Sequence, residues 1–349
     1  MATIVSILSE QLIPNVLFIK QMGKPGDKHV FISTEEMEQR KRKSETIVFC
    51  LNLKPNQYKV MTIDANSPAL ILAALKKFNF PPEEHYVVNI TGGNKIMSQF
   101  TYLHFKEFKN VVISYWPIQR NVIEQLHPDL QSIDLGKVNS LPLETYVNAH
   151  GFNISSPLKT SFPFSVSNAV FNNVIANGKP EMVPEIRDAR SAQYVKDDKG
   201  YYNGIWFEEW MYDFLKKELK LAENAIAFNV QLKSIFSERG SESDAEIDVA
   251  FVYRNKLFIW ECKVYNSGTV KGTRINEAVN KISSFSPALG IQATSIVAIL
   301  SPFGPDIQRK KSIVDNIRLR NVAKVFSLED MRNKHNFITE VKKIIHYEP

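Results

Sequence analysis

Residues 246–264 read EIDVAFVYRNKLFIWECKV. Two runs rich in β-branched and aromatic residues flank a polar Arg-Asn-Lys turn, which predicts two strands, 246–253 and 257–264, joined as an antiparallel hairpin. Successive side chains of a strand point to opposite faces, so Glu261 and Lys263 share one face and Cys262 takes the other. Pairing of the two strands brings Asp248 beside Glu261.

Two carboxylates at one point repel each other unless a cation lies between them, and their hard oxygens favour Mg²⁺ or Mn²⁺. Asp248 and Glu261 are therefore candidate metal ligands, and Lys263 is a candidate to position a water molecule. The polar face of an ordinary half-buried hairpin is the alternative. It is disfavoured because unpaired charges inside so apolar a strand are costly to bury.

Outward from the hairpin, the pattern predicts a second α/β domain. An amphipathic helix at 204–220 precedes the hairpin and carries Glu208, a candidate third metal ligand and catalytic acid. The neighbouring Glu209 competes with it, because adjacent helical residues lie on different faces. Helices are expected at 276–286 and 306–320, and strands at 295–300 and 323–326.

Basic residues follow the hairpin along the chain. Lysines and arginines on a helix usually mark a solvated face, but their nearness to the carboxylates favours contacts with the phosphates of a nucleic acid. The candidates are Lys271 and Arg274, in the loop after the Glu-x-Lys strand, and Arg309 and Lys310, which share the predicted helix 306–320 with Lys311, Arg318 and Arg320.

The first 135 residues alternate short apolar runs with helical patterns, which predicts a mostly parallel, Rossmann-like sheet covered by helices. Strands are expected at 3–8, 46–51, 59–63, 86–90 and 111–115, and helices at 13–21, 67–78 and 94–107. Proline- and glycine-containing breaks interrupt residues 136–200. We expect an N-terminal domain at 1–140, a connector at 141–200 and a C-terminal domain at 201–349.

Two loops of the N-terminal domain fall at the carboxyl edge of the predicted sheet, where Rossmann-like folds bind ligands. One is Thr91-Gly92-Gly93-Asn94-Lys95, which ends a strand and opens a helix, so its free N–H groups suit a phosphate. The other is Ser9-Glu10-Gln11. Plain turn chemistry and helix capping are the alternatives for these loops. Neither a Walker A loop nor a Gly-x-Gly-x-x-Gly fingerprint is present.

Composition sets limits on this interpretation. The chain has 349 residues, a formal net charge of +6 and two cysteines. A basic protein is compatible with a polyanionic partner. The two cysteines lie in apolar runs, the N-terminus lacks signal-peptide features, and no apolar stretch is long enough to span a bilayer. We therefore expect a cytoplasmic protein with no membrane association.

The Asp, Glu-x-Lys and helix-acid pattern resembles the PD-(D/E)xK, or restriction-endonuclease-like, nuclease signature. That resemblance implies that Asp248, Glu261 and Glu208 bind metal and that Lys263 assists catalysis. The Pro-Asp pair that names the family is absent, because Ile247 precedes Asp248. The Thr-Gly-Gly-x-Lys loop is similar to that of a CARF domain, the CRISPR-associated Rossmann fold. The whole chain thus resembles the CARF plus PD-(D/E)xK effector nucleases of type III CRISPR systems.

The resemblance implies an α/β protein with an N-terminal Rossmann-like CARF domain and a C-terminal restriction-endonuclease-like domain. It further implies a homodimer that binds cyclic tetra-adenylate and then cleaves single-stranded RNA and DNA or nicks supercoiled DNA, with the connector transmitting the signal. The ligand residues implied are Ser9, Glu10, Gln11 and Thr91 to Lys95. A restriction or repair endonuclease that needs no signal, and a sensor without catalysis, are the alternatives.

Overall fold

The protein is described from a computed structural model, which covers residues 1–117, 120, 122–135, 140–156, 163–178, 201–237, 245–265, 269–291, 293–304 and 311–348. The chain divides into two compact units. The first comprises Met1–Asn139 with Asn148–Gly151, and the second comprises Ser140–Val147 with Phe152–Pro349. None of the described helices is both long enough and apolar enough to cross a membrane.

The first unit is built on a seven-stranded sheet in the order β3-β2-β1-β4-β5-β6-β7. Strands β1 to β5 are parallel, and β6 and β7 are antiparallel. The strands are β1 (Thr3–Ile7), β2 (Lys28–Ser33), β3 (Tyr58–Thr62), β4 (Tyr86–Asn89), β5 (Val111–Tyr115), β6 (Val122–His127) and β7 (Gln131–Asp134). The helices are α1 (Ile13–Met22), α2 (Glu35–Gln39), α3 (Lys43–Leu51), α4 (Pro68–Lys77) and α5 (Lys95–Phe105).

The predicted strand at 46–51 is wrong, because these residues form most of helix α3. The run Ile47-Val48-Phe49-Cys50-Leu51 is apolar without a break, so its composition fits a strand as well as a helix. In the helix only one face is buried: Ile47 is fully buried, whereas Phe49 is 45% exposed. The strand position next to β1 belongs instead to β2, which the sequence analysis missed.

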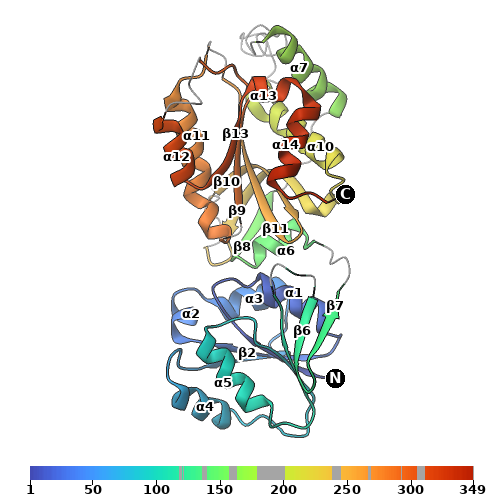
Figure 1. The fold of residues 1–349 in the computed structure, drawn as a ribbon, viewed down its shortest axis with the longest axis vertical. Helices are drawn as coiled ribbons and strands as arrows, with labels where there is room; N and C mark the ends of the chain where they lie inside the picture. Colours follow the sequence, from blue (N-terminus) through green and yellow to red (C-terminus); the bar gives the residue numbers. More distant parts are fainter. Residues whose placement is uncertain are drawn as a thin grey trace. The chain divides into compact units, whose positions relative to one another are not determined.

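The order of strands reverses between β1 and β4, which are neighbours in the sheet. Loops that follow these two strands therefore meet at one point of the carboxyl edge, the place where open α/β sheets bind ligands. Figure 1 shows α1 and α3 on one face of this sheet and α4 and α5 on the other. The residues on the α4 and α5 face form a continuous apolar core that includes Val5, Ile7, Val88 and Leu75.

The second unit contains a six-stranded sheet in the order β13-β12-β11-β10-β9-β8. Its strands are β8 (Phe152–Ser156), β9 (Ile226–Ser234), β10 (Ala245–Tyr253), β11 (Lys256–Lys263), β12 (Thr294–Ile299) and β13 (Val322–Phe326). Strands β8 to β11 are antiparallel neighbours, and β11, β12 and β13 are parallel. Edge strand β8 lies in the segment expected to connect the domains, so part of that segment belongs to this sheet.

Helices cover both faces of the second sheet (Figure 1). One face carries α11 (Gly272–Phe285) and α12 (Lys311–Leu319). The other carries α7 (Phe164–Asn177), α10 (Trp206–Glu218), α13 (Leu328–Arg332) and α14 (Lys334–Ile344), and α6 (Leu143–Asn148) completes the unit. The core on the α10 face is aromatic, with Trp206, Trp210 and Trp260 fully buried. The α11 face carries the charged side chains described next.

Candidate functional site

The hairpin of β10 and β11 has the predicted register and brings Asp248 beside Glu261. Val249 pairs with Trp260, so the next residues outward, Asp248 and Glu261, face each other across the two strands. One oxygen of Asp248, Oδ2, accepts a hydrogen bond from the backbone N–H of Cys262 at 2.7 Å. The carboxylate therefore replaces a backbone acceptor at this point of the ladder, which fixes its orientation.

Two lysine ammonium groups bridge this carboxylate pair. Nζ of Lys263 lies 2.5 Å from Oε1 of Glu261 and 3.1 Å from Oδ2 of Asp248. Nζ of Lys281 lies 2.9 Å from Oε2 of Glu261 and 3.5 Å from Oδ1 of Asp248. Lys263 is on β11, as predicted, whereas Lys281 comes from α11 and was missed by the sequence analysis. From the sequence alone, a lysine of an amphipathic helix that pairs with buried carboxylates cannot be distinguished from one that faces solvent.

Burial makes this cluster electrostatically strong. The side chains of Asp248 and Glu261 are 2% and 1% exposed, whereas those of Lys263 and Lys281 are 31% and 41% exposed. Burial and the charge of Asp248 raise the pKa of Glu261. Burial alone would lower the pKa of Lys263, but the charges of Asp248 and Glu261 outweigh it and raise that pKa above its usual range. The lysines are held charged by the carboxylates they cover.

Glu208, the predicted helix acid, lies in the first turn of α10 and is half-buried. Burial and the negative charge of Asp248 raise the pKa of Glu208 to about 8, so the two carboxyl groups act on each other electrostatically. Its competitor Glu209 is 1% exposed. Burial and the charge of Glu209 raise the pKa of Asp213, so Glu209 lies near Asp213. Glu208, in contrast, interacts electrostatically with Asp248 of the hairpin.

The carboxylate pair fits a hard divalent cation in its chemistry. Asp248 and Glu261 supply buried oxygen donors whose charge needs cations for compensation, the environment that Mg²⁺ and Mn²⁺ occupy. Within the described residues, no three His, Cys, Asp or Glu side chains converge closely enough to hold an ion. The pair is thus the assembled part of the candidate centre, and Glu208 is not brought into a three-residue cluster with it.

A strained residue lies opposite Asp248 on the neighbouring strand. Asn229 on β9 has a φ of 45°, in the left-handed region, although it belongs to a strand. The ladder pairs Ile247 with Val230 and Val249 with Phe228, which leaves Asn229 opposite Asp248. Asparagine tolerates this conformation better than most residues, and such strain concentrates at functional sites. We interpret Asn229 as the irregularity that shapes β9 beside the carboxylate.

Replacing Asn229 by valine is expected to lower the free energy of unfolding by about 1–2 kcal/mol, because a β-branched residue resists the left-handed region. The matched control is Asn229→Gly, which reaches the same φ without a side-chain penalty and costs at most about 1 kcal/mol. Urea denaturation of both variants measures the difference. Equal loss in the two variants would show that the Asn229 side chain, and not its backbone, is what matters.

The two predicted loops of the first unit meet at the carboxyl edge of its sheet. A methyl group added at Gly92 would lie 2.0 Å from the carbonyl oxygen of Ile7, the last residue of β1. The loop after β4 is therefore packed directly against the end of β1, from which the loop with Ser9, Glu10 and Gln11 departs. Gly93 has a φ of 72°, which favours glycine. The sequence placed these loops correctly with respect to each other.

Several predicted ligand residues have structural partners in these loops. The Thr91 hydroxyl donates to Oδ1 of Asn89 at 2.5 Å and accepts from the Trp116 N–H at 2.8 Å. Asn94 caps α5 by accepting from the Met97 N–H at 2.9 Å. The Ser9 hydroxyl donates to the Gln11 carbonyl at 3.0 Å. These side chains shape the loops, and Asn94 caps its helix. The capping alternative for the loop of Ser9 to Gln11 is wrong, because α1 has Leu12 at its N-cap and no side-chain cap there.

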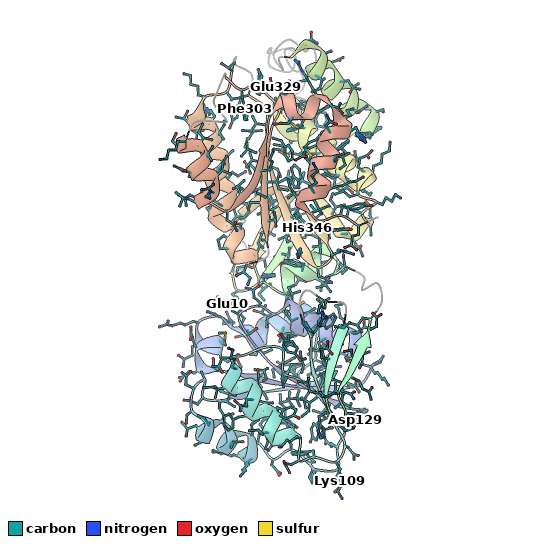
Figure 2. The ribbon with its side chains drawn as sticks, in the orientation of Figure 1. Glu10, Lys109, Asp129, Phe303, Glu329 and His346 are labelled. Atoms are coloured by element: carbon teal, nitrogen blue, oxygen red, sulfur yellow. The ribbon has the colours of Figure 1, made fainter. Side chains whose placement is uncertain are left out.

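The start of α5 is exposed at this edge, and a basic, partly buried segment contacts the loop that contains Glu10. Gly93 and Lys95 are exposed on the outer side of the first loop. Lys41 donates to Oε1 of Glu10 at 3.1 Å, and Glu10 is labelled in Figure 2. Burial lowers the pKa of Lys43, although the charge of Glu10 opposes the shift. The basic run Arg40-Lys41-Arg42-Lys43 is visible in the sequence, but it was not among the predicted ligand residues.

Some of the residues predicted to contact nucleic acid lie in the part of the chain that the structure describes. Lys271 precedes α11 and is exposed. Arg274 is paired with Glu277 at 2.9 Å, and its guanidinium lies 5.8 Å from the centre of the Tyr265 ring. Arg309 and Lys310 lie outside the described residues. Arg274 lies in the first turn of the helix that carries Lys281, and Lys271 is the N-cap of that helix, so both described basic residues belong to the element beside the carboxylate pair.

Comparison with known protein families gives two matches. Residues 3–146 match the family described as Card1 CARF domain. Residues 195–323 match the family described as Card1-like, endonuclease domain. The two matches together span well over half of the chain and correspond in order to the two sheets. None of the curated proteins matches the chain.

Solved structures share the fold over the whole chain. Protein VC1899 from Vibrio cholerae has a TM-score of 0.74 at 15% identity, with 99% of each chain covered. Can2 from Sulfobacillus thermosulfidooxidans, solved with cyclic tetra-adenylate, has a TM-score of 0.70 at 19% identity, covering 97% of this chain and 99% of Can2. A type III CRISPR defence DNA nuclease activated by cyclic oligoadenylate has a TM-score of 0.56 at 15% identity, covering 87% of this chain and 47% of that one.

Proposed function

The chain belongs to the family in which a Card1 CARF domain is joined to a Card1-like endonuclease domain, and on this premise we propose that it is a metal-dependent nuclease activated by cyclic tetra-adenylate in a type III CRISPR system. The observation that carries the proposal is the buried Asp248 and Glu261 pair, bridged by Lys263 on the endonuclease unit. Burying two carboxylates side by side costs free energy, and buried charged groups of this kind are typical of functional sites.

We assign the roles of a PD-(D/E)xK site to these residues. Asp248 and Glu261 would hold Mg²⁺ or Mn²⁺, and Lys263 would orient the attacking water and offset charge on the phosphate. Glu208, which does not form a three-carboxylate cluster with the pair, would have to move toward it to serve as the third ligand. The bound ion supplies Lewis-acid stabilisation of the phosphoryl oxygens and a lower pKa for a water molecule. The hydrogen bond from Cys262 N–H keeps the Asp248 carboxylate aimed at this point.

For the N-terminal domain we propose that cyclic tetra-adenylate binds at the carboxyl edge between β1 and β4. The support is the exposed start of α5 beside the loop of Ser9, Glu10 and Gln11, together with the Can2 structure, whose own ligand is cyclic tetra-adenylate. A symmetric cyclic ligand suits a homodimer, in which each subunit presents the same loops to half of the ring. Binding must favour the active arrangement over the resting one.

The proposed substrates are single-stranded RNA, single-stranded DNA and supercoiled DNA, bound through Lys271, Arg274, Arg309 and Lys310. The test is cleavage of each labelled substrate with Mg²⁺, with Mn²⁺ and with chelator, in the presence and absence of cyclic tetra-adenylate. We expect cleavage of at least one substrate, dependent on both ion and ligand and decreasing steeply with added salt. Cleavage without ligand would indicate a restriction or repair enzyme, and no cleavage of any substrate would contradict the assignment.

A further inference from the structure

The second lysine of the cluster, Lys281, duplicates the contacts of Lys263. Each ammonium group reaches one oxygen of Asp248 and one oxygen of Glu261, and the two lysines use different oxygens of each carboxylate. All four carboxylate oxygens of the pair are therefore within 3.5 Å of an ammonium group. Two negative and two positive charges make the cluster neutral as it stands.

A divalent cation that binds this neutral cluster meets competition. It needs the same carboxylate oxygens, and it adds two positive charges beside two ammonium groups that already contact those oxygens. Like charges at such distances repel, and the repulsion is strongest next to the buried carboxylates, where little water screens it. One ammonium group has to leave the pair before the cation gains its oxygen donors.

The contacts distinguish the two lysines. Lys263 has the shorter distance to each carboxylate and also donates to the Cys262 carbonyl at 3.2 Å. Lys281 is held at 2.9 and 3.5 Å, its side chain is the more exposed of the two at 41%, and it extends from a helix. Lys281 is thus the more weakly held group and has open solvent beside it.

The position of Lys281 on α11 would let its ammonium group, once it has left the carboxylates, reach a phosphate of the substrate. Arg274 lies seven residues earlier, which places the two side chains on the same helix face two turns apart. A nucleic-acid strand that ran along this helix face would meet first one and then the other of Arg274 and Lys281. An ammonium group that turns away from the carboxylates there faces the phosphates of that strand.

We propose that Lys281 is the counterion of the metal-free site, that a divalent cation displaces it, and that its ammonium group then binds a phosphate of the nucleic-acid substrate. The inference rests on the proposed function, because it assumes that Asp248 and Glu261 hold the ion. It assigns Lys281 a role different from that of Lys263, which stays at the pair. No covalent step is involved.

The test measures Mn²⁺ binding to the full-length protein without substrate, by electron paramagnetic resonance of free Mn²⁺. Lys281→Met removes the competing charge at similar side-chain length, and it is expected to tighten Mn²⁺ binding by about tenfold or more. Lys281→Arg keeps the charge and should stay near the wild-type affinity. Lys343→Met removes the same charge from an exposed position of α14, on the opposite face of the sheet, and controls for the change in net charge.

Lys281→Met is expected to change metal binding and substrate binding in opposite directions, which a general loss of stability would not do. Lys281→Met should weaken substrate binding in Ca²⁺ and lower the slope of log affinity against log salt by about 1. Without metal its melting temperature should fall, and saturating Mn²⁺ should raise it more than in the wild type. Unchanged or weaker Mn²⁺ binding in Lys281→Met would overturn the inference alone. Equal Mn²⁺ binding by wild type and Asp248→Asn would overturn the proposed metal site and, with it, this inference.

Discussion

Asp248→Asn is expected to abolish nucleic-acid cleavage, with a rate loss of about 1000-fold or more, because it removes a charged oxygen donor from the centre that stabilises the transition state. The asparagine amide oxygen can still accept from the Cys262 N–H, so the hairpin should stay folded. Its NH₂ group, however, would take the place of Oδ1 and face the ammonium group of Lys281. The measurement is a single-turnover time course with saturating Mn²⁺ and cyclic tetra-adenylate.

The matched control for Asp248→Asn is Glu246→Gln. Glu246 lies two residues earlier on the same strand and is exposed, so the same change of carboxylate to amide is made outside the buried pair. This control should cleave near the wild-type rate, and both variants should bind cyclic tetra-adenylate normally. Wild-type cleavage by Asp248→Asn would show that the reaction takes place elsewhere in the protein.

Gly92→Ala is expected to weaken the binding of cyclic tetra-adenylate. The added methyl group would lie 2.0 Å from the Ile7 carbonyl oxygen, and because this atom belongs to the backbone of β1, the loop itself has to move. Forced overpacking of this kind costs about 1–3 kcal/mol. We expect ligand affinity to fall by about 10- to 100-fold, equivalent to about 1.4–2.7 kcal/mol. Equilibrium binding to the full-length protein measures the loss.

Gly23→Ala separates a binding defect from general destabilisation. Its methyl group would lie 2.5 Å from the Ile19 carbonyl oxygen, so it meets a comparable backbone conflict in the same unit. Gly23 follows α1 and precedes β2, at the edge of the sheet away from the ligand loops. Gly23→Ala should lower the melting temperature yet keep ligand affinity. Equal loss of affinity in both variants would mean that the Gly92 loop has no special part in binding.

The hairpin at 246–264 shows what local sequence can determine. Its turn and two apolar strands fix the register, and the register alone places Asp248 opposite Glu261. Alternation along β11 then brings Lys263 to the same face. The carboxyl-edge loops were predictable for the same reason, since parallel strands that are neighbours in the sheet end at one edge.

The misplaced strand at 46–51 and the unpredicted role of Lys281 have tertiary causes. An unbroken apolar run of five residues carries no period, so only packing of α3 against its neighbours decides that Ile47 is buried while Phe49 is exposed. Lys281 is one of several charged residues on an amphipathic helix. Its role depends on where α11 packs against β11, which no local pattern encodes. The αL conformation of Asn229 is likewise set by the sheet around it.

Catalysis through Lys263 and its activation by cyclic tetra-adenylate are tested together by cleavage of one labelled substrate by wild type and Lys263→Ala, each with Mn²⁺ and with or without cyclic tetra-adenylate. Cleavage is expected only by wild type with ligand, and none by Lys263→Ala in either condition. Equal cleavage by wild type with and without ligand would contradict activation through the N-terminal domain. Ligand-dependent cleavage that survives in Lys263→Ala would contradict the assignment of the site.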